Sequence, residues 1–324
     1  MIQVGLLLTN KYRLLSVAAI LDVFDTVNSH YENNGEAPFF KINLIRNGNL
    51  AFEGASFEKY SSLSLNESGQ QDLVLIPAFD GTDLNSSIHN NLEFLPWMQQ
   101  QYKKGAELAS FCTGAFLLAA SGLLNGKSAT THVNASQAFS SSFPDVYFKP
   151  DKVVTIDKGI YTSGGATSSF HLMLTLIHNY CNRNLAVHIA KIFAIDMNRE
   201  QQSYFGTFHP AKDHGDDLVV KTQLCIENAY KEAVTIEDIL QQIPSSRRNI
   251  VRRFKQATGS TLIEYLQKTR IEAAKRLLEQ TNFSILEIML HSGYNDLKTF
   301  RQLFKKNSGM TPKDYRDKFK PKAA

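Results

Sequence analysis

The sequence predicts two domains, an α/β domain with a layered, largely parallel sheet and an all-helical domain that follows it. Three observations support this prediction. Short apolar runs alternate with helical stretches over residues 2–197, a pattern typical of a sheet covered by helices. The segment from residue 235 onward repeats itself fifty residues later. Between the two patterns, residues 199–217 are polar, contain Gly and Pro, and show no sustained periodicity.

The first domain is expected to begin with a strand and to alternate from there. Apolar runs short enough for buried strands, the last two forming a hairpin, occur at residues 2–8, 39–45, 73–76, 106–111, 153–156 and 160–162. Helices are expected at residues 14–29, 92–103, 113–124, 164–181 and 185–197. In such a sheet, ligands bind at the carboxyl ends of the strands, where loops meet helix N-termini.

The helical domain contains a duplication. A shift of fifty residues superimposes identical residues in similar settings: Phe254-Lys255 on Phe304-Lys305, Gly259 on Gly309, Thr261 on Thr311, and Tyr265 on Tyr315. Each copy predicts a helix, a turn of about four residues and a second helix, which is the helix-turn-helix pattern. The first helix of each copy begins with a capping-box sequence, Thr235 with Asp238 and Ser284 with Glu287.

The second helix of each copy has an apolar face and a polar face. Ile250 with Phe254, and Phe300 with Phe304, are four residues apart and are expected in the core. The opposite faces carry side chains that match base edges or phosphates in a major groove, namely Arg248, Asn249, Arg252 and Lys255 in one copy and Lys298, Thr299, Gln302 and Lys305 in the other. A solvated basic face would explain one such helix equally well, but two in register favour DNA recognition.

Residues 261–280 join the two copies and contain neither proline nor glycine, with apolar residues at helical steps. About twenty residues at about 1.5 Å each give a helix of roughly 30 Å. Because successive turns of a DNA groove lie about 34 Å apart, this helix could hold two recognition helices in consecutive major grooves.

Charge and composition fit a nucleic-acid reader joined to a second domain. Residues 216–324 hold 20 Lys and Arg against 13 Asp and Glu, whereas the rest of the chain holds 15 against 18. No apolar run approaches the roughly twenty residues that cross a membrane, and the N-terminus lacks the pattern of a signal peptide. The three cysteines have no metal-like spacing. We therefore expect a cytoplasmic protein with no metal and no cofactor.

Several motifs of the helical domain together resemble the AraC/XylS family of transcription regulators. They are Arg252-Arg-Phe-Lys255, residues 270–278, Gly293-Tyr294, residues 300–305, Gly309-Met-Thr-Pro312 and Tyr315-Arg316. The resemblance extends from about Leu218 onward and implies an activity on promoter DNA, with RNA polymerase as a partner. Leu240 and Met289 stand where the family usually has a small alanine in the first helix of each unit.

Cys112 stands between the strand at residues 106–111 and the helix that begins at residue 113. A cysteine at this place lies at the positive end of a helix dipole, which lowers the pKa of the thiol and favours the thiolate. The sequence therefore places a thiol that favours ionisation at the sheet edge where ligands bind, and leaves open whether Cys112 is reactive or structural.

The segment Ser110-Phe-Cys-Thr-Gly-Ala115 resembles the nucleophile elbow of the ThiJ/PfpI class, within the class I glutamine-amidotransferase-like superfamily. The segment that ends at Thr131-His132 matches the same class. The resemblance covers about residues 2–197 and implies an α/β sandwich with flavodoxin-like layering. Ser16 stands where catalytic relatives carry a supporting Glu, and residues 78–81 replace their usual Gly-Gly. Because nucleophilic catalysis needs those parts, we expect no enzyme.

An effector pocket is the preferred interpretation of the residues near the elbow. The candidate effector-binding residues are Asp80, Gly81, Cys112, Thr113, His132, Gly164 and Gly165. A hydrogen-bonded structural histidine would explain His132 as well, and a tight turn would explain the two glycines. Many regulators of this type carry Asp at the position of His171, so the ligand preference of this chain is expected to differ.

These features divide the chain into an effector or dimerisation domain (residues 1–198), an interdomain linker (199–217) and an AraC-type DNA-binding domain (218–324). They predict a sequence-specific transcriptional regulator that binds double-stranded DNA as a homodimer and responds to a small-molecule effector. Two alternatives remain. One is a ThiJ/PfpI-type cysteine enzyme, of amidase, glyoxalase or deglycase kind, fused to a DNA-binding domain. The other is a DNA-binding scaffold whose α/β domain only dimerises.

Overall fold

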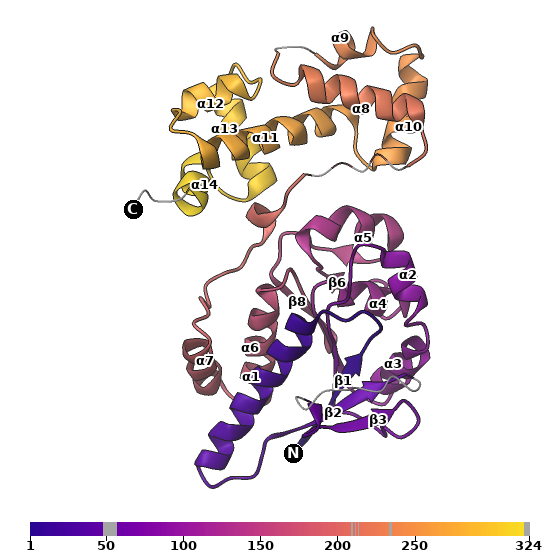
Figure 1. Ribbon diagram of the computed structural model, residues 1–324, viewed down its shortest axis with the longest axis vertical. Coiled ribbons are helices and arrows are strands. Elements are labelled where there is room, and N and C mark those ends of the chain that lie inside the picture. The colour runs from indigo at the N-terminus through magenta and orange to yellow at the C-terminus, as the bar shows by residue number, and fades with distance from the viewer. Residues whose placement is uncertain (48–56, 209, 211, 213, 233–234, 321–324) are drawn as a thin grey trace. The chain divides into compact units, whose positions relative to one another are not determined.

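The computed structural model describes residues 1–47, 57–208, 210, 212, 214–232 and 235–320. The chain folds as two compact units, Met1–Gln202 and Ser203–Ala324 (Figure 1). The division falls inside the stretch expected to be a linker (residues 199–217), and residues of that stretch pack in both units. Gln202 is buried in the first unit, and Phe208 packs against a core cluster of the second. Residues 199–202 therefore group with the first unit, and residues 209, 211 and 213 of the expected linker lie outside the described residues.

A seven-stranded sheet forms the middle layer of the first unit, in the order β3-β2-β1-β4-β5-β9-β8. Its strands are β1 (Ile2–Leu8), β2 (Phe40–Arg46), β3 (Ser61–Ser64), β4 (Leu73–Ile76), β5 (Glu107–Ser110), β8 (Val154–Asp157) and β9 (Ile160–Ser163). Neighbouring strands are parallel except β8, which pairs antiparallel with β9 and confirms the predicted hairpin. Strand β3 was not predicted because its residues, Ser-Ser-Leu-Ser, do not form an apolar run.

Helices cover both faces of this sheet, with α1, α6 and α7 on one side and α2, α3 and α4 on the other (Figure 1). Their bounds are α1 (Leu14–Asn33), α2 (Leu84–His89), α3 (Phe94–Lys103), α4 (Gly114–Ala120), α5 (Ser136–Ser142), α6 (Ser168–Tyr180) and α7 (Arg183–Ile192). Along β1, Leu6 and Leu8 join one core cluster and Leu7 joins the other, as the two-residue period of a strand requires. A small second sheet pairs β6 (Ser128–Ala129) with β7 (Tyr147–Phe148). The predicted α/β sandwich is confirmed.

The second unit is helical, as predicted. Its helices are α8 (Asp217–Ala229), α9 (Ile236–Leu240), α10 (Arg247–Thr258), α11 (Leu262–Gln280), α12 (Ile285–His291), α13 (Leu297–Ser308) and α14 (Pro312–Phe319). Both predicted capping boxes form, at the starts of α9 and α12. Gly259 and Gly309 end α10 and α13 with φ of 68° and 78°, a left-handed conformation that favours glycine.

Each helix-turn-helix copy has its own core, and α11 contributes to both. Tyr265 and Leu266 of α11 pack in the first cluster, and Ala274 and Leu278 pack in the second. The duplication extends to a hydrogen bond, because the Tyr265 hydroxyl donates to Glu227 at 2.6 Å and the Tyr315 hydroxyl donates to Glu279 at 2.7 Å. The predicted rod of residues 261–280 is confirmed as α11, which at about 1.5 Å per residue is roughly 28 Å long.

The larger residues that replace the family's alanines are accommodated. Met289 is buried in the second core, and Leu240 packs at the margin of the first. No helix in the described part of the chain combines the length and the apolar character that crossing a membrane requires.

Candidate DNA-binding surface and effector site

Helices α10 and α13, the second helices of the two helix-turn-helix copies, have matching patterns of burial. In α10 the buried residues are Ile250, Phe254 and Thr258, and in α13 they are Phe300, Phe304 and Ser308, each fifty positions later. The opposite faces are solvent-exposed and hold Arg248, Arg252 and Lys255 in the first copy and Lys298, Thr299, Gln302 and Lys305 in the second. The predicted polar faces therefore lie where the sequence analysis expected them.

Some of the predicted DNA-contacting side chains also have local partners. The Asn249 amide, which is half-buried, donates to the Ser245 hydroxyl at 3.0 Å. The equivalent residue in the second copy, Thr299, donates its backbone N–H to the Asp296 carboxylate at 2.7 Å. Both positions thus stabilise the start of a recognition helix. The Lys255 ammonium donates to the Gly259 carbonyl at 2.8 Å and lies 3.9 Å from Glu264.

Arg248 and Arg252 on α10, and Lys298 and Gln302 on α13, extend from the exposed faces. Within the described residues, none of these four side chains forms a hydrogen bond or an ion pair with the rest of the chain. They are therefore available to donate to base edges, and Arg and Gln are side chains that can do so with two bonds at once.

In the first unit, Cys112 occupies a strained turn between β5 and α4, with φ of 54°. The turn is tight because Gly114 lies against the backbone of β4, where an added Cβ would stand 2.6 Å from the Ile76 carbonyl oxygen. Cys112 itself is buried, and this burial raises the pKa of its thiol to about 11. The predicted thiolate is therefore wrong: loss of water around the sulfur outweighs the helix end and the Thr113 hydrogen bonds that favour the charge.

The backbone N–H groups after β4 are already bonded within the chain. Ala78 donates to the Ser16 hydroxyl at 3.0 Å, Phe79 donates to the Thr113 hydroxyl at 3.0 Å, and Asp80 donates to the Lys11 carbonyl at 3.0 Å. Ser16, found where catalytic relatives carry Glu, thus holds the loop in place. An oxyanion would find these three donors occupied.

His132 and the glycine pair lie beside the elbow and are organised by a residue that the sequence analysis assigned to the linker. The Gln202 side chain accepts from the Gly165 N–H at 3.1 Å and donates to the Thr131 carbonyl at 2.9 Å. A Cβ on Gly164 would overlap the Gln202 amide. Gly164 therefore makes room for Gln202, whereas Gly165 lies against the His132 ring. No periodic pattern in the sequence could have indicated the role of Gln202.

The remaining candidate residues come together as expected. The Cys112 N–H donates to the Ser163 carbonyl at 3.2 Å, next to Gly164, and the Thr131 hydroxyl donates to the Cys112 carbonyl at 2.8 Å, next to His132. Gly81 lies against the Thr113 side chain. Burial lowers the pKa of His132, which accepts a hydrogen bond from the Asn134 N–H at 3.2 Å.

Arg13 belongs to the same site but was not predicted. Its guanidinium lies 3.6 Å from the Asp80 carboxylate. Burial is the largest cause of the lowered pKa of His132, and the positive charge of Arg13 lowers this pKa further. The same charge opposes the rise that burial causes in the pKa of Cys112. A single arginine ahead of an apolar helix carries no signal in the sequence; only the fold brings it to the elbow.

The raised pKa gives a test of the Cys112 environment. At pH 7 a thiol with a pKa of about 11 is ionised in only about one molecule in ten thousand. Alkylation of Cys112 by iodoacetamide should therefore be slow at pH 7 and should accelerate about tenfold per pH unit up to pH 9, as measured by mass spectrometry of the Cys112 peptide. The Cys225 peptide in the same digest serves as an internal reference. A rate that reaches a plateau near neutral pH would contradict the buried, neutral thiol.

Comparisons with known proteins agree with this two-part architecture. Residues 51–179 match the model of the DJ-1/PfpI family, and residues 240–318 match the model of a helix-turn-helix domain. The HTH-type transcriptional regulator GbdR of Pseudomonas aeruginosa is 24% identical over 322 residues, covering 97% of this chain and 84% of GbdR. The regulator GlxA of Rhizobium meliloti is 23% identical over 322 residues, covering 96% of this chain and 94% of GlxA. The chain is a DNA-binding transcriptional regulator that joins an N-terminal DJ-1/PfpI-family domain to an AraC-type helix-turn-helix domain.

A solved structure confirms the fold of the first unit of this regulator. A crystallised protein of Vibrio parahaemolyticus, 20% identical, covers 59% of this chain and 98% of its own length with a TM-score of 0.50. The helix-turn-helix domain makes the regulator a DNA-binding protein, and the two relatives that align over nearly the whole of this chain are named as regulators.

Proposed function

We propose that this regulator reads its operator with the exposed faces of α10 and α13, placed in two consecutive major grooves on one side of the DNA. The observation that carries this proposal is the identical burial pattern of the two helices, fifty residues apart, on a single α11 rod. One rigid helix of roughly 28 Å suits the spacing of about 34 Å between successive groove turns, given the width of the helices themselves.

The side chains of this surface divide by chemistry. Arg248, Arg252, Lys298 and Gln302 contact bases, and Asn249 and Thr299 form the edge of the base-reading surface at the helix starts. Lys255 and Lys305, near the helix ends, contact phosphates and contribute to affinity rather than to specificity. A genome-wide map of binding sites for the purified protein tests the proposal, since a shared sequence motif should emerge. Binding with no preference over random DNA at moderate salt would reject it.

We also propose that the α/β unit senses a small molecule and does not catalyse a reaction. Three features support this: the bonded N–H groups after β4, Ser16 in place of a supporting carboxylate, and the neutral thiol of Cys112. The proposed effector site comprises Asp80, Gly81, Cys112, Thr113 and His132, with Gly164 and Gly165 contributing through Gln202, and with Arg13 at its margin.

The enzyme alternative gives a second test. Purified protein should show no amidase, glyoxalase or deglycase turnover above background, and Cys112→Ser should leave that background unchanged. A clear turnover that disappears in the Cys112→Ser variant would favour the cysteine enzyme instead.

The remaining proposed partners are a second copy of the chain, measured by sedimentation, and RNA polymerase at a cytoplasmic promoter.

A further inference from the structure

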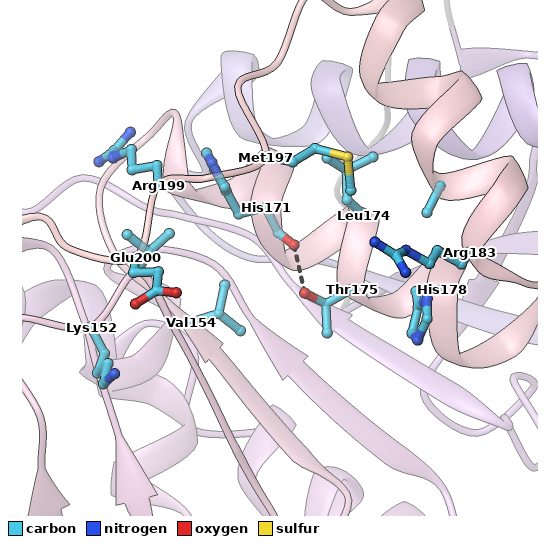
Figure 2. A pocket seen from close by; sticks show the side chains of 12 residues that line it. Lys152, Val154, His171, Leu174, Thr175, His178, Arg183, Met197, Arg199 and Glu200 are labelled. Atoms are coloured by element: carbon cyan, nitrogen blue, oxygen red, sulfur yellow. Dashed lines mark hydrogen bonds between the residues drawn. The ribbon is translucent and has the colours of Figure 1, made fainter.

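A pocket lies in the α/β unit, apart from the elbow. It is a cavity of about 350 Å³ between the edge strand β8, the outer face of α6 and the start of α7 (Figure 2). Its lining residues are Lys152, Val153, Val154, His171, Leu174, Thr175, His178, Arg183, Ala186, Met197, Arg199 and Glu200. None of them belongs to the proposed site around Cys112. The volume falls in the range of small-molecule pockets, about 300–1,000 Å³.

The two ends of this pocket differ in charge. Figure 2 shows Arg183 beside His178 at one end and Lys152 near Glu200 at the other. In the part of the chain that the structure describes, no carboxylate forms an ion pair with Arg183. The Arg183 end is therefore cationic and uncompensated, whereas Lys152 and Glu200 offset each other at the opposite end.

The other two basic residues are held in the wall. Arg199 donates to the Thr167 hydroxyl at 2.6 Å and to the Ser168 hydroxyl at 3.2 Å. The His171 ring nitrogens lie 2.9 Å from the Asp196 carbonyl and 3.2 Å from the Thr167 carbonyl. Arg183 is consequently the group best placed to bind an anion, and its planar guanidinium matches a carboxylate with two parallel hydrogen bonds.

Between the two ends the surface is apolar. Val154, Leu174, Ala186 and Met197 line it, and Met197 is 45% exposed. Methionine is flexible enough to fit ligands of different shapes. An apolar body next to one unpaired guanidinium, with no net positive charge at the far end to bind a second anionic group, selects a monoanion with a hydrocarbon or aromatic body.

We propose that this pocket binds a small monocarboxylic acid, with the carboxylate at Arg183 and the apolar body against Leu174 and Met197. Ligand binding at this site would affect regulation because Met197, Arg199 and Glu200 lie on the last segment of the α/β unit. That segment is fixed on both sides of the pocket, by the Val153 N–H donating to the Glu200 carbonyl at 3.3 Å and by the buried Gln202 amide. A bound acid would strengthen the attachment of this segment immediately before Ser203, where the helical unit begins.

The test uses the full chain and calorimetric titration with hexanoate, octanoate and phenylacetate at millimolar concentrations. We expect at least one of these acids to bind, and hexanamide and the dianion adipate to bind at least about tenfold more weakly. Arg183→Gln should weaken binding of the acid by at least about tenfold, since the substitution removes the positive charge that pairs with the carboxylate. Lys191→Gln, an equal change of charge at an exposed position of the same helix outside the pocket, should leave binding unchanged.

Two results would overturn the proposal. One is no heat and no thermal stabilisation with any of the three acids. The other is binding that survives Arg183→Gln but is lost in Arg13→Gln, which would place the anion at the elbow instead. Operator binding by the same preparations is measured separately, so a failure of this site is distinguishable from a failure of the DNA-binding proposal.

Discussion

Replacing Arg252 and Gln302 together with alanine should remove most of the specific operator binding, a loss of about 2–6 kcal/mol. The two residues occupy equivalent positions of α10 and α13, fifty apart, and both are exposed. A side chain that reads a base contributes about 1–3 kcal/mol, and two contacts in separate grooves should add. Affinity is measured by fluorescence anisotropy at fixed salt, on an operator recovered from the genomic map and on random duplex.

Two controls make this result specific. Lys221→Ala removes a positive charge from an exposed position of α8, outside both recognition helices, and should change operator affinity by only a few tenths of a kcal/mol. Lys305→Ala should weaken operator and random DNA alike and reduce the salt slope by about one. A double variant that keeps operator affinity within about 1 kcal/mol would show that these faces do not read the sequence.

Phe304→Ala should destabilise the second helix-turn-helix copy by about 3–5 kcal/mol. Phe304 is fully buried and packs edge-on against Tyr315, with ring centroids 5.5 Å apart, so alanine leaves a cavity that rigid helices cannot close. The chain offers two separate reporters of unfolding. Its single tryptophan, Trp97, lies in the α/β unit, whereas helical circular dichroism reports both units.

In a urea titration, the Trp97 fluorescence transition of Phe304→Ala should match that of the unchanged chain while part of the dichroism is lost at lower urea. Phe254→Ala, its counterpart in the first copy, should behave in the same way because it is equally buried. Leu286→Ala changes a side chain that is 53% exposed and should have little effect. If the fluorescence and dichroism transitions of Phe304→Ala moved together, the two units would not unfold independently.

The elbow of the α/β unit combines a strained turn with an environment that disfavours an ionised thiol. Cys112 retains the strained turn, yet its thiol is buried and neutral, and the neighbouring N–H groups are used to hold the loop. Such an elbow is stable and preorganised, which suits recognition of a ligand, while it offers neither an ionised nucleophile nor free donors for a developing charge.

The sequence by itself determined the features that depend on short stretches of chain. The strands at 2–8 and 73–76, the capping boxes at Thr235 and Ser284, the α11 rod and the repeated recognition helices all follow from local periodicity and end signals, which neighbouring residues supply. For the same reason the DNA-contacting candidates could be placed on exposed faces before the fold was known.

Only the tertiary structure decided the features that depend on what covers a residue. The pKa of Cys112 rises because distant segments exclude water from it, an effect that outweighs the helix end visible in the sequence. Gln202, Arg13 and Arg183 acquire their roles from partners far along the chain or from a cavity formed by several elements. Periodicity records which side of a helix or strand is buried, but burial of one polar group is set by packing between elements, and no local pattern encodes that.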